Sequence, residues 1–284
     1  MAKLLFGTAG IPHSTKSGGS VEGIERIREL GLGCMELEFV RGVHMGKEAA
    51  EKVNEARKKM GVELSVHAPY FINLNAKEKS KLAASKMRII QSARIGSIAG
   101  ANIVVFHPAY YMKERPEIVY GKVKEALEDI QDKLKSENVK IRLGLETTGK
   151  GTQFGTLGEV LSLSKELKMV FPCVDFSHLH ARCGGCLKGK KEFGEVVKVL
   201  GKSGKSLLKD LHMHISGINY GPRGERNHLN FEDGECDFNY KALIDVLKDE
   251  KVGGTVICES PCLEHDALLM QRHYQRQSEV NERY

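Results

Sequence analysis

The sequence predicts a single (β/α)8 barrel, an α/β fold in which eight parallel strands alternate with helices. Three observations lead to this prediction. Short apolar runs alternate with longer stretches of helical periodicity through the whole chain. Eight such pairs favour a parallel sheet that closes on itself. The length of 284 residues suits one barrel of about 250 residues, so we expect one domain over residues 1–284.

Each expected strand is a short apolar run, and each expected helix follows its strand directly. The strands lie at residues 4–8, 34–40, 63–67, 102–107, 141–146, 171–175, 211–214 and 255–259. The helices lie at residues 21–30, 47–59, 77–98, 117–134, 157–167, 192–200, 240–247 and 265–274. Gly31, Gly61 and Gly100 follow three of these helices, as helix-ending glycines do. An open doubly wound sheet is the alternative, but Gly7-Thr-Ala-Gly10 does not match the GxGxxG loop of its dinucleotide-binding form.

Six of the expected strands end in a histidine or a carboxylate. These residues are His67, His107, Glu146, Asp175, His214 and Glu259. The C-terminal ends of all strands in a parallel barrel lie at one face, so these side chains would converge there. Clustered carboxylates and imidazoles need compensation for charge and desolvation, which metal ions supply. With the loop residues His178, Glu225 and His228, the set is large enough for two or three ions of zinc, manganese or cobalt.

Composition and charge place few limits on the function. A formal net charge of +6 permits a nucleic-acid partner without requiring one. No apolar run reaches the about 20 residues that span a bilayer, and the N-terminus lacks a signal-peptide pattern. We therefore expect a cytoplasmic protein with no membrane partner. Seven cysteines without framework spacing argue against a disulfide scaffold. The lone Cys183-Gly-Gly-Cys186 is interpreted as two thiols in a Gly-rich loop, with a redox or metal role as the alternative.

The order of several motifs resembles endonuclease IV, the family of trinuclear-zinc apurinic/apyrimidinic endonucleases. The motifs are Ser65-Val-His67-Ala-Pro-Tyr70-Phe-Ile-Asn73, Phe106-His107-Pro, Leu145-Glu146-Thr-Thr, Val174-Asp175-Phe-Ser-His178, His214-Ile-Ser, His228 and Cys258-Glu259-Ser-Pro. The resemblance spans residues 60–265 and is specific as a set. It implies a zinc-dependent (β/α)8 phosphodiesterase that nicks double-stranded DNA on the 5′ side of abasic sites, in base excision repair.

The resemblance also implies roles for individual residues around three zinc ions. The implied ligands are His67, His107 and Glu146 for the first zinc, Glu146, Asp175, His214 and Glu259 for the second, and His178 and His228 for the third. The family's remaining third-zinc ligand is an Asp two residues before the last His, where this chain has Arg226. Glu225 is the nearest carboxylate and is taken as the substitute. Glu146 and Glu259 would also be catalytic, with the attacking water beside Glu146 and Glu259 positioning it.

The loop after His67 carries two neighbouring aromatic residues, Tyr70 and Phe71. By resemblance to the family, they would enter the DNA minor groove and fill the gap left by an extruded nucleotide, assisted by Arg41. Packing on the barrel rim is the alternative. Basic residues in strand-to-helix loops are candidate phosphate contacts, namely Lys113, Arg115, Lys150, Arg223 and Arg226.

Other polar residues on the strands allow two interpretations. Glu36 and Glu38 share one face of the second strand. The sequence of this strand resembles that of the broader xylose isomerase-like barrel superfamily. The two glutamates are either site residues or a buried polar layer below the metals. His212 also points inward, but His214 is preferred as the ligand because it lies nearer the strand end. The remaining histidines expected in ordinary loops are His13, His44 and His180.

Two rival functions stay open. A sugar isomerase or epimerase of that superfamily would use one or two metals at Glu146, Asp175, His214 and Glu259. A non-catalytic damage-binding barrel would bind metal or DNA without turnover. The expected state is a monomer, although the sequence carries no direct signal of oligomeric state.

Overall fold

Eight parallel strands close into a barrel in the computed structural model, which describes residues 3–16 and 18–281. Around the barrel the order is β1-β12-β9-β8-β6-β4-β3-β2. The strands are β1 (Leu4–Ala9), β2 (Cys34–Glu38), β3 (Glu63–His67), β4 (Ile103–Phe106), β6 (Arg142–Glu146), β8 (Val170–Asp175), β9 (Leu211–Ile215) and β12 (Gly254–Cys258). The predicted (β/α)8 fold is confirmed, and every predicted strand end lies within about two residues of the observed one.

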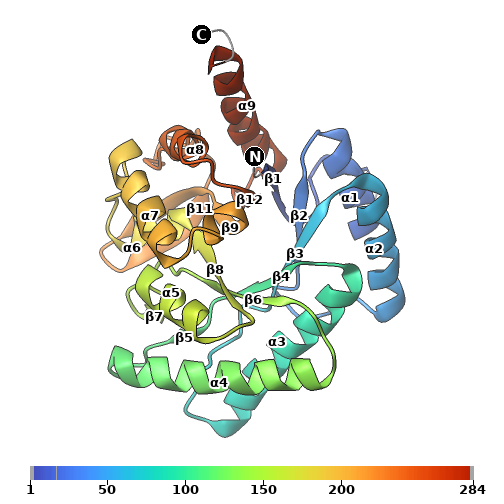
Figure 1. Cartoon of the computed structure of the whole chain (residues 1–284), viewed down its shortest axis with the longest axis vertical. Helices are drawn as coiled ribbons and strands as arrows, with labels where there is room; N and C mark the ends of the chain where they lie inside the picture. The colour runs from blue at the N-terminus through green and yellow to red at the C-terminus, as the bar shows by residue number, and fades with distance from the viewer. Residues whose placement is uncertain (1–2, 17, 282–284) are drawn as a thin grey trace.

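Helices surround the ring of strands (Figure 1). Those predicted from the sequence are α1 (Ser20–Glu29), α2 (Lys47–Met60), α3 (Lys79–Ala99), α4 (Pro116–Ser136), α5 (Leu157–Glu166), α7 (Lys190–Ser203), α8 (Tyr240–Asp249) and α9 (Glu264–Asn281). Helix α9 continues past its predicted end at residue 274 and extends away from the barrel in Figure 1. Of the helices within the described residues, none combines the length and apolarity required to cross a membrane.

Local sequence signals explain where several helices begin and end. Gly61 and Gly100 follow α2 and α3 with φ of 65° and 79°, the left-handed conformation that glycine adopts at low cost. Helix α5 begins with a capping box in which Thr156 and Glu159 each accept a hydrogen bond from the other's backbone N–H. These ends keep the connections short and hold each helix against its strand.

The barrel interior changes character along its axis, because alternate residues of a strand point inward. On β4 the inward series runs from Ile103 through Val105 to His107, just beyond the strand end. On β8, Cys173 precedes Asp175. Ile103, Val105 and Cys173 form a buried apolar cluster separate from the main core between strands and helices. On these two strands the polar side chains therefore lie above apolar ones, at the C-terminal face of the barrel.

The structure adds short elements in segments that the sequence predicted as loops. Helix α6 (Phe176–Arg182) follows β8 directly, and a 3-10 helix (Leu207–Lys209) precedes β9. Strands β5 (Ala109–Tyr110) and β7 (Gln153–Phe154) pair antiparallel, as do β10 (Gly217–Gly221) and β11 (Gly224–Leu229). The predicted loop positions of His178, Glu225 and His228 are therefore wrong, since His178 lies on α6 and the other two on β11.

Candidate metal centre

Glu146 is fully buried at the end of β6 and lies at the centre of the candidate site. Its Oε2 is 3.2 Å from His67 Nε2 and 3.0 Å from His107 Nε2. Its Oε1 is 3.1 Å from His178 Nδ1 and 3.4 Å from His214 Nδ1. One carboxylate thus meets histidines from four separate segments. Ligand atoms of Glu146, His67 and His107 lie within 4.8 Å of one another, close enough to share one ion.

A second group of possible ligands also contains Glu146. Its other members are Asp175 at the end of β8, His214 on β9 and Glu259 just after β12, and their ligand atoms again lie within 4.8 Å of one another. His214 Nδ1 is 3.3 Å from Glu259 Oε1. Three carboxylates and one imidazole form a donor set that suits a divalent cation.

The third group joins His178 to Glu225 and His228 of β11. Asp175 is the N-cap of α6, because its Oδ1 accepts a hydrogen bond of 2.6 Å from the backbone N–H of His178. The first turn of α6 thereby places His178 beside the strand end, with its Nε2 3.5 Å from Glu225 Oε2. His228 Nδ1 lies 3.0 Å from the carbonyl oxygen of Glu259, which ties the third group to the second.

A β-bulge determines which residue of β11 reaches the third group. The register between β10 and β11 shifts at Tyr220, which pairs with Glu225 and leaves Arg226 without a partner in the ladder. In a regular strand, Arg226 would share a face with His228, because residues two apart point the same way. The extra residue reverses that alternation. Glu225 therefore faces the same side as His228, while Arg226 is exposed.

Several buried polar atoms of these groups have no hydrogen bond of acceptable geometry within the described part of the chain, despite their charged neighbours. They are Glu146 Oε1, Asp175 Oδ2, Glu259 Oε2 and both ring nitrogens of His214. Buried polar atoms in native proteins nearly always have partners. A cation within the second group would satisfy both the carboxylate oxygens and an imidazole lone pair, so the donor atoms fit a bound divalent metal.

Burial and mutual charge shift the pKa values of the same side chains. Burial raises the pKa of Asp175 well above its usual range, helped by the charge of Glu259. Burial acts the same way on Glu146, but the charges of His107 and His214 outweigh it and hold the Glu146 pKa well below its usual range. For His67, burial opposes the charged form, yet the hydrogen bond and charge of Glu146 raise the pKa to about 10. Metal binding must therefore displace protons from this site.

The aromatic pair predicted to contact DNA lies on the rim next to the ligands. Tyr70 and Phe71 are 58% and 67% exposed, unusually high for large apolar side chains. The Tyr70 ring lies 5.4 Å from the His67 ring. The backbone N–H of Tyr70 donates to the carbonyl of Val40. The loop that carries Tyr70 therefore lies against the loop that carries the exposed Arg41. The three predicted DNA contacts are thus close to one another in space.

Three of the five candidate phosphate contacts gather beside the third group. Lys150, Arg223 and Arg226 line a cavity of about 580 Å³ whose wall also includes Glu225. The cavity therefore places three cationic side chains next to the third group. The other two candidates, Lys113 and Arg115, lie in the connection between β5 and α4, outside this cavity.

The two glutamates of β2 occupy different environments. Glu36 is fully buried, with Oε1 3.0 Å from His214 Nε2 and Oε2 3.2 Å from His212 Nε2. His212 points inward as predicted, but it lies below the second group, which contains His214 instead. Burial raises the pKa of Glu38 to about 8. Glu36 thus lies in a polar layer beneath the candidate ligands and touches one of them directly, whereas Glu38 pairs in register with His67 and lies level with it.

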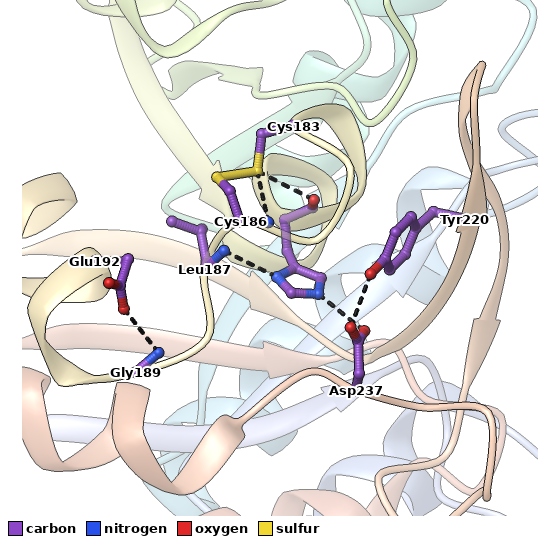
Figure 2. The surroundings of a disulfide bond; sticks show 8 residues. Cys183, Cys186, Leu187, Gly189, Glu192, Tyr220 and Asp237 are labelled. Atoms are coloured by element: carbon purple, nitrogen blue, oxygen red, sulfur yellow. Dashed lines mark hydrogen bonds and ion pairs between the residues drawn. A yellow bond between two sulfur atoms is a disulfide. The ribbon is translucent and has the colours of Figure 1, made fainter.

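The turn after α6 contains a disulfide between Cys183 and Cys186, so the interpretation of two free thiols is wrong (Figure 2). Both cysteines are exposed. A pair of cysteines this close in sequence carries no signal that separates a disulfide from two thiols. The backbone N–H of Cys186 also donates to Cys183 Sγ over 3.1 Å, which closes the turn.

His180 was predicted in an ordinary loop, but it is a buried residue of α6. The backbone N–H of Leu187 donates to His180 Nδ1 over 3.2 Å, and His180 Nε2 lies 3.0 Å from Asp237 Oδ1. Tyr220 of β10 donates to the other oxygen of Asp237 over 2.8 Å. These contacts connect the turn to the hairpin that carries Glu225 and His228.

One supporting residue was not identified from the sequence. Arg182, at the end of α6, donates from Nη1 to the carbonyls of Thr148, Lys150 and Gln153. It thereby holds the connection between β6 and β7, in which a side chain at Gly149 would collide with Glu225. No local pattern distinguishes this arginine from a solvated one at a helix end.

Comparisons with known proteins agree with the fold. A model of the xylose isomerase-like TIM barrel family matches residues 24–278. An uncharacterized protein of Methanocaldococcus jannaschii is 44% identical over 272 residues, covering 95% of this chain and 97% of that protein. A probable endonuclease 4 of the Aster yellows witches'-broom phytoplasma is 33% identical over 118 residues, which is 40% of each protein.

Two solved structures resemble the whole barrel. That of a D-tagatose 3-epimerase-like protein has a TM-score of 0.70 at 21% identity, covering 97% of this chain and 99% of that chain. That of endonuclease IV from Thermus thermophilus has a TM-score of 0.69 at 19% identity, covering 96% and 99%. At these identities the likeness concerns the fold alone, and it extends equally to an epimerase-like protein and a nuclease.

Proposed function

The chain belongs to the xylose isomerase-like TIM barrel family, and from this premise we propose that it is a zinc-dependent phosphodiesterase that cleaves double-stranded DNA on the 5′ side of abasic sites. Five groups of possible metal ligands occur within the described residues. The observation that carries the proposal is that three of them adjoin one another around Glu146, and two of these share that residue. A sugar epimerase would use only the second group. The first group's histidines and the whole third group would then have no role.

Each part of the site has an assignment in this reaction. Bound metal ions would lower the pKa of a water toward about 7 and neutralise charge on the phosphate. Glu259, whose Oε2 has no hydrogen-bond partner among the described residues, positions that water next to Glu146. Manganese or cobalt would suit the same donors as zinc.

The rim supplies the contacts to DNA. Tyr70 and Phe71 present apolar rings beside the ligands and fill the space left by the extruded abasic nucleotide, with Arg41 on the adjacent loop. Lys150 and Arg223 line the cavity beside the third group and hold backbone phosphates. The proposal describes a cytoplasmic, monomeric enzyme, and sedimentation of the protein measures the oligomeric state.

The test is cleavage of a duplex that carries one synthetic abasic site, with metals counted on the same sample. We expect a single nick on the 5′ side that leaves a 3′-hydroxyl, with close to three metals per chain. Prolonged chelation should abolish the nick, and zinc should restore it. Glu259→Gln should slow cleavage by roughly 100-fold or more. Glu250→Gln, an exposed change at the end of α8, is the matched control.

Two outcomes would replace the proposal. A metal-loaded chain with one or two ions that does not nick the duplex, but epimerises a ketose, would identify a sugar enzyme that uses the second group. A chain that binds the abasic duplex tightly with three metals and never cleaves it would identify a damage-binding barrel.

A further inference from the structure

Four of the five candidate ligand histidines have one ring nitrogen beside a fixed acceptor outside the three groups or on the backbone. In three of them the acceptor is a backbone carbonyl. These contacts are His67 Nδ1 with Ala68 O at 2.8 Å, His178 Nδ1 with Thr147 O at 3.0 Å, and His228 Nδ1 with Glu259 O at 3.0 Å. His214 differs, because its outward nitrogen is Nε2 and the group 3.0 Å from it is the Glu36 carboxylate.

We propose that Glu36 is a positioning residue for the second metal, acting through His214. The proposal rests on the metal-dependent function proposed above and assigns a role to a residue outside the three ligand groups. A neutral imidazole carries one N–H and one lone pair. Although the contact lacks hydrogen-bond geometry in this structure, a negative charge 3.0 Å from Nε2 favours the hydrogen on that nitrogen. The lone pair of Nδ1 then faces Glu146 and Glu259 at 3.4 and 3.3 Å.

Glu36 is itself held in place from the side opposite the metals. Its second oxygen is 3.2 Å from His212 Nε2, and His212 Nδ1 is 2.7 Å from Thr255 Oγ1. Strands β2 and β9 are separated in the barrel by β1 and β12, so the carboxylate reaches His214 across the interior. A fully buried carboxylate needs such partners to remain charged. The orientation of His214 is therefore fixed by a series of side-chain contacts from Thr255 through His212 to Glu36.

The same strand provides a matched control. Glu38 lies two residues further along β2, on the same face, and its Oε1 is buried without a hydrogen-bond partner among the described residues. Glu36→Gln and Glu38→Gln each remove one buried carboxyl from β2 while keeping its shape. Only the first removes a carboxylate that touches a ligand histidine.

The experiment titrates metal-free protein with Co²⁺ in competition with a coloured chelator, and it records the cobalt absorption spectrum. We expect Glu36→Gln to weaken one of the bound ions by about 10–100-fold and to change its spectrum. Glu38→Gln should bind all ions as the unchanged chain does. Equal affinities in all three proteins, or equal weakening in both variants, would overturn the positioning role.

Two further results keep this inference separate from the proposed function. If the wild-type chain binds no metal stoichiometrically, both proposals are refuted. If it binds metal and nicks DNA, and the Glu36→Gln variant binds metal with unchanged affinity, only the role of Glu36 is refuted. If Glu36→Gln does not fold, NMR of zinc-loaded wild-type protein with ¹⁵N-labelled histidine decides the matter. We expect the hydrogen of His214 on Nε2, and a hydrogen on Nδ1 would overturn the inference.

Discussion

Replacing Glu225 by alanine should remove the third metal and leave the other two bound. The Glu225 side chain is 14% exposed and is the only carboxylate that the structure groups with His178 and His228 within the described residues. Structural zinc sites bind with about 10–16 kcal/mol at pH 7, which for four ligands is about 3 kcal/mol each. Since 1.4 kcal/mol corresponds to about tenfold, losing this ligand should weaken the third ion roughly a hundredfold.

Arg226→Ala is the informative comparison for this prediction. Because the bulge turns Arg226 away from His228, its removal should leave all metal affinities unchanged. The assay is a competition titration with zinc and a chromophoric chelator, followed by a metal count after gel filtration. If Glu225→Ala retained three ions while Arg226→Ala lost one, the assignment of the bulge and of the substitute ligand would be wrong.

Three other expectations follow from the geometry. Metal affinity should rise with pH, by about tenfold per pH unit for each proton displaced. The reason is that the hydrogen bond and charge of Glu146 outweigh the effect of burial on His67 and raise its pKa to about 10, so a metal must displace a proton there. A flat profile in titrations at several pH values would contradict this. Phe71→Ala should weaken binding of an abasic duplex by about 1–3 kcal/mol without changing the metal count, and an unchanged dissociation constant would argue for simple rim packing. Cys183→Ser should lower the free energy of unfolding by about 2 kcal/mol, since the disulfide closes a short loop; a urea midpoint equal to that of the oxidised wild-type chain would count against it.

The strands were predictable because burial on both faces makes them largely apolar runs, and the histidine or carboxylate that ends six of them marks the mouth of the barrel. Asp175 and Glu259 could be identified in this way. Helix α6 does not follow from the sequence pattern because Asp175, the last residue of β8, is also its N-cap, so no loop separates the strand from the helix. The hairpin that carries Glu225 was missed because it lies over the mouth and is largely polar, which leaves no apolar periodicity to detect.

The contact of Glu36 with His214 was also beyond sequence reasoning. The two residues lie on strands that are distant in the chain and not adjacent in the barrel, and their proximity depends on closure of the ring. The inward direction of Glu36 followed from alternation, but which side chain it meets across the interior did not.

The bulge at Arg226 bears on how relatives of this chain should be recognised. A sequence signature that requires an acidic residue two positions before His228 would score this protein as lacking a ligand. The Glu225 carboxylate nevertheless reaches the group of His178 and His228, because the bulge adds one residue to the strand. Where a strand tolerates such an insertion, a chemical group can keep its place in space while its place in an alignment moves. Searches for such sites should therefore allow variable spacing on strands that cover the mouth of a barrel.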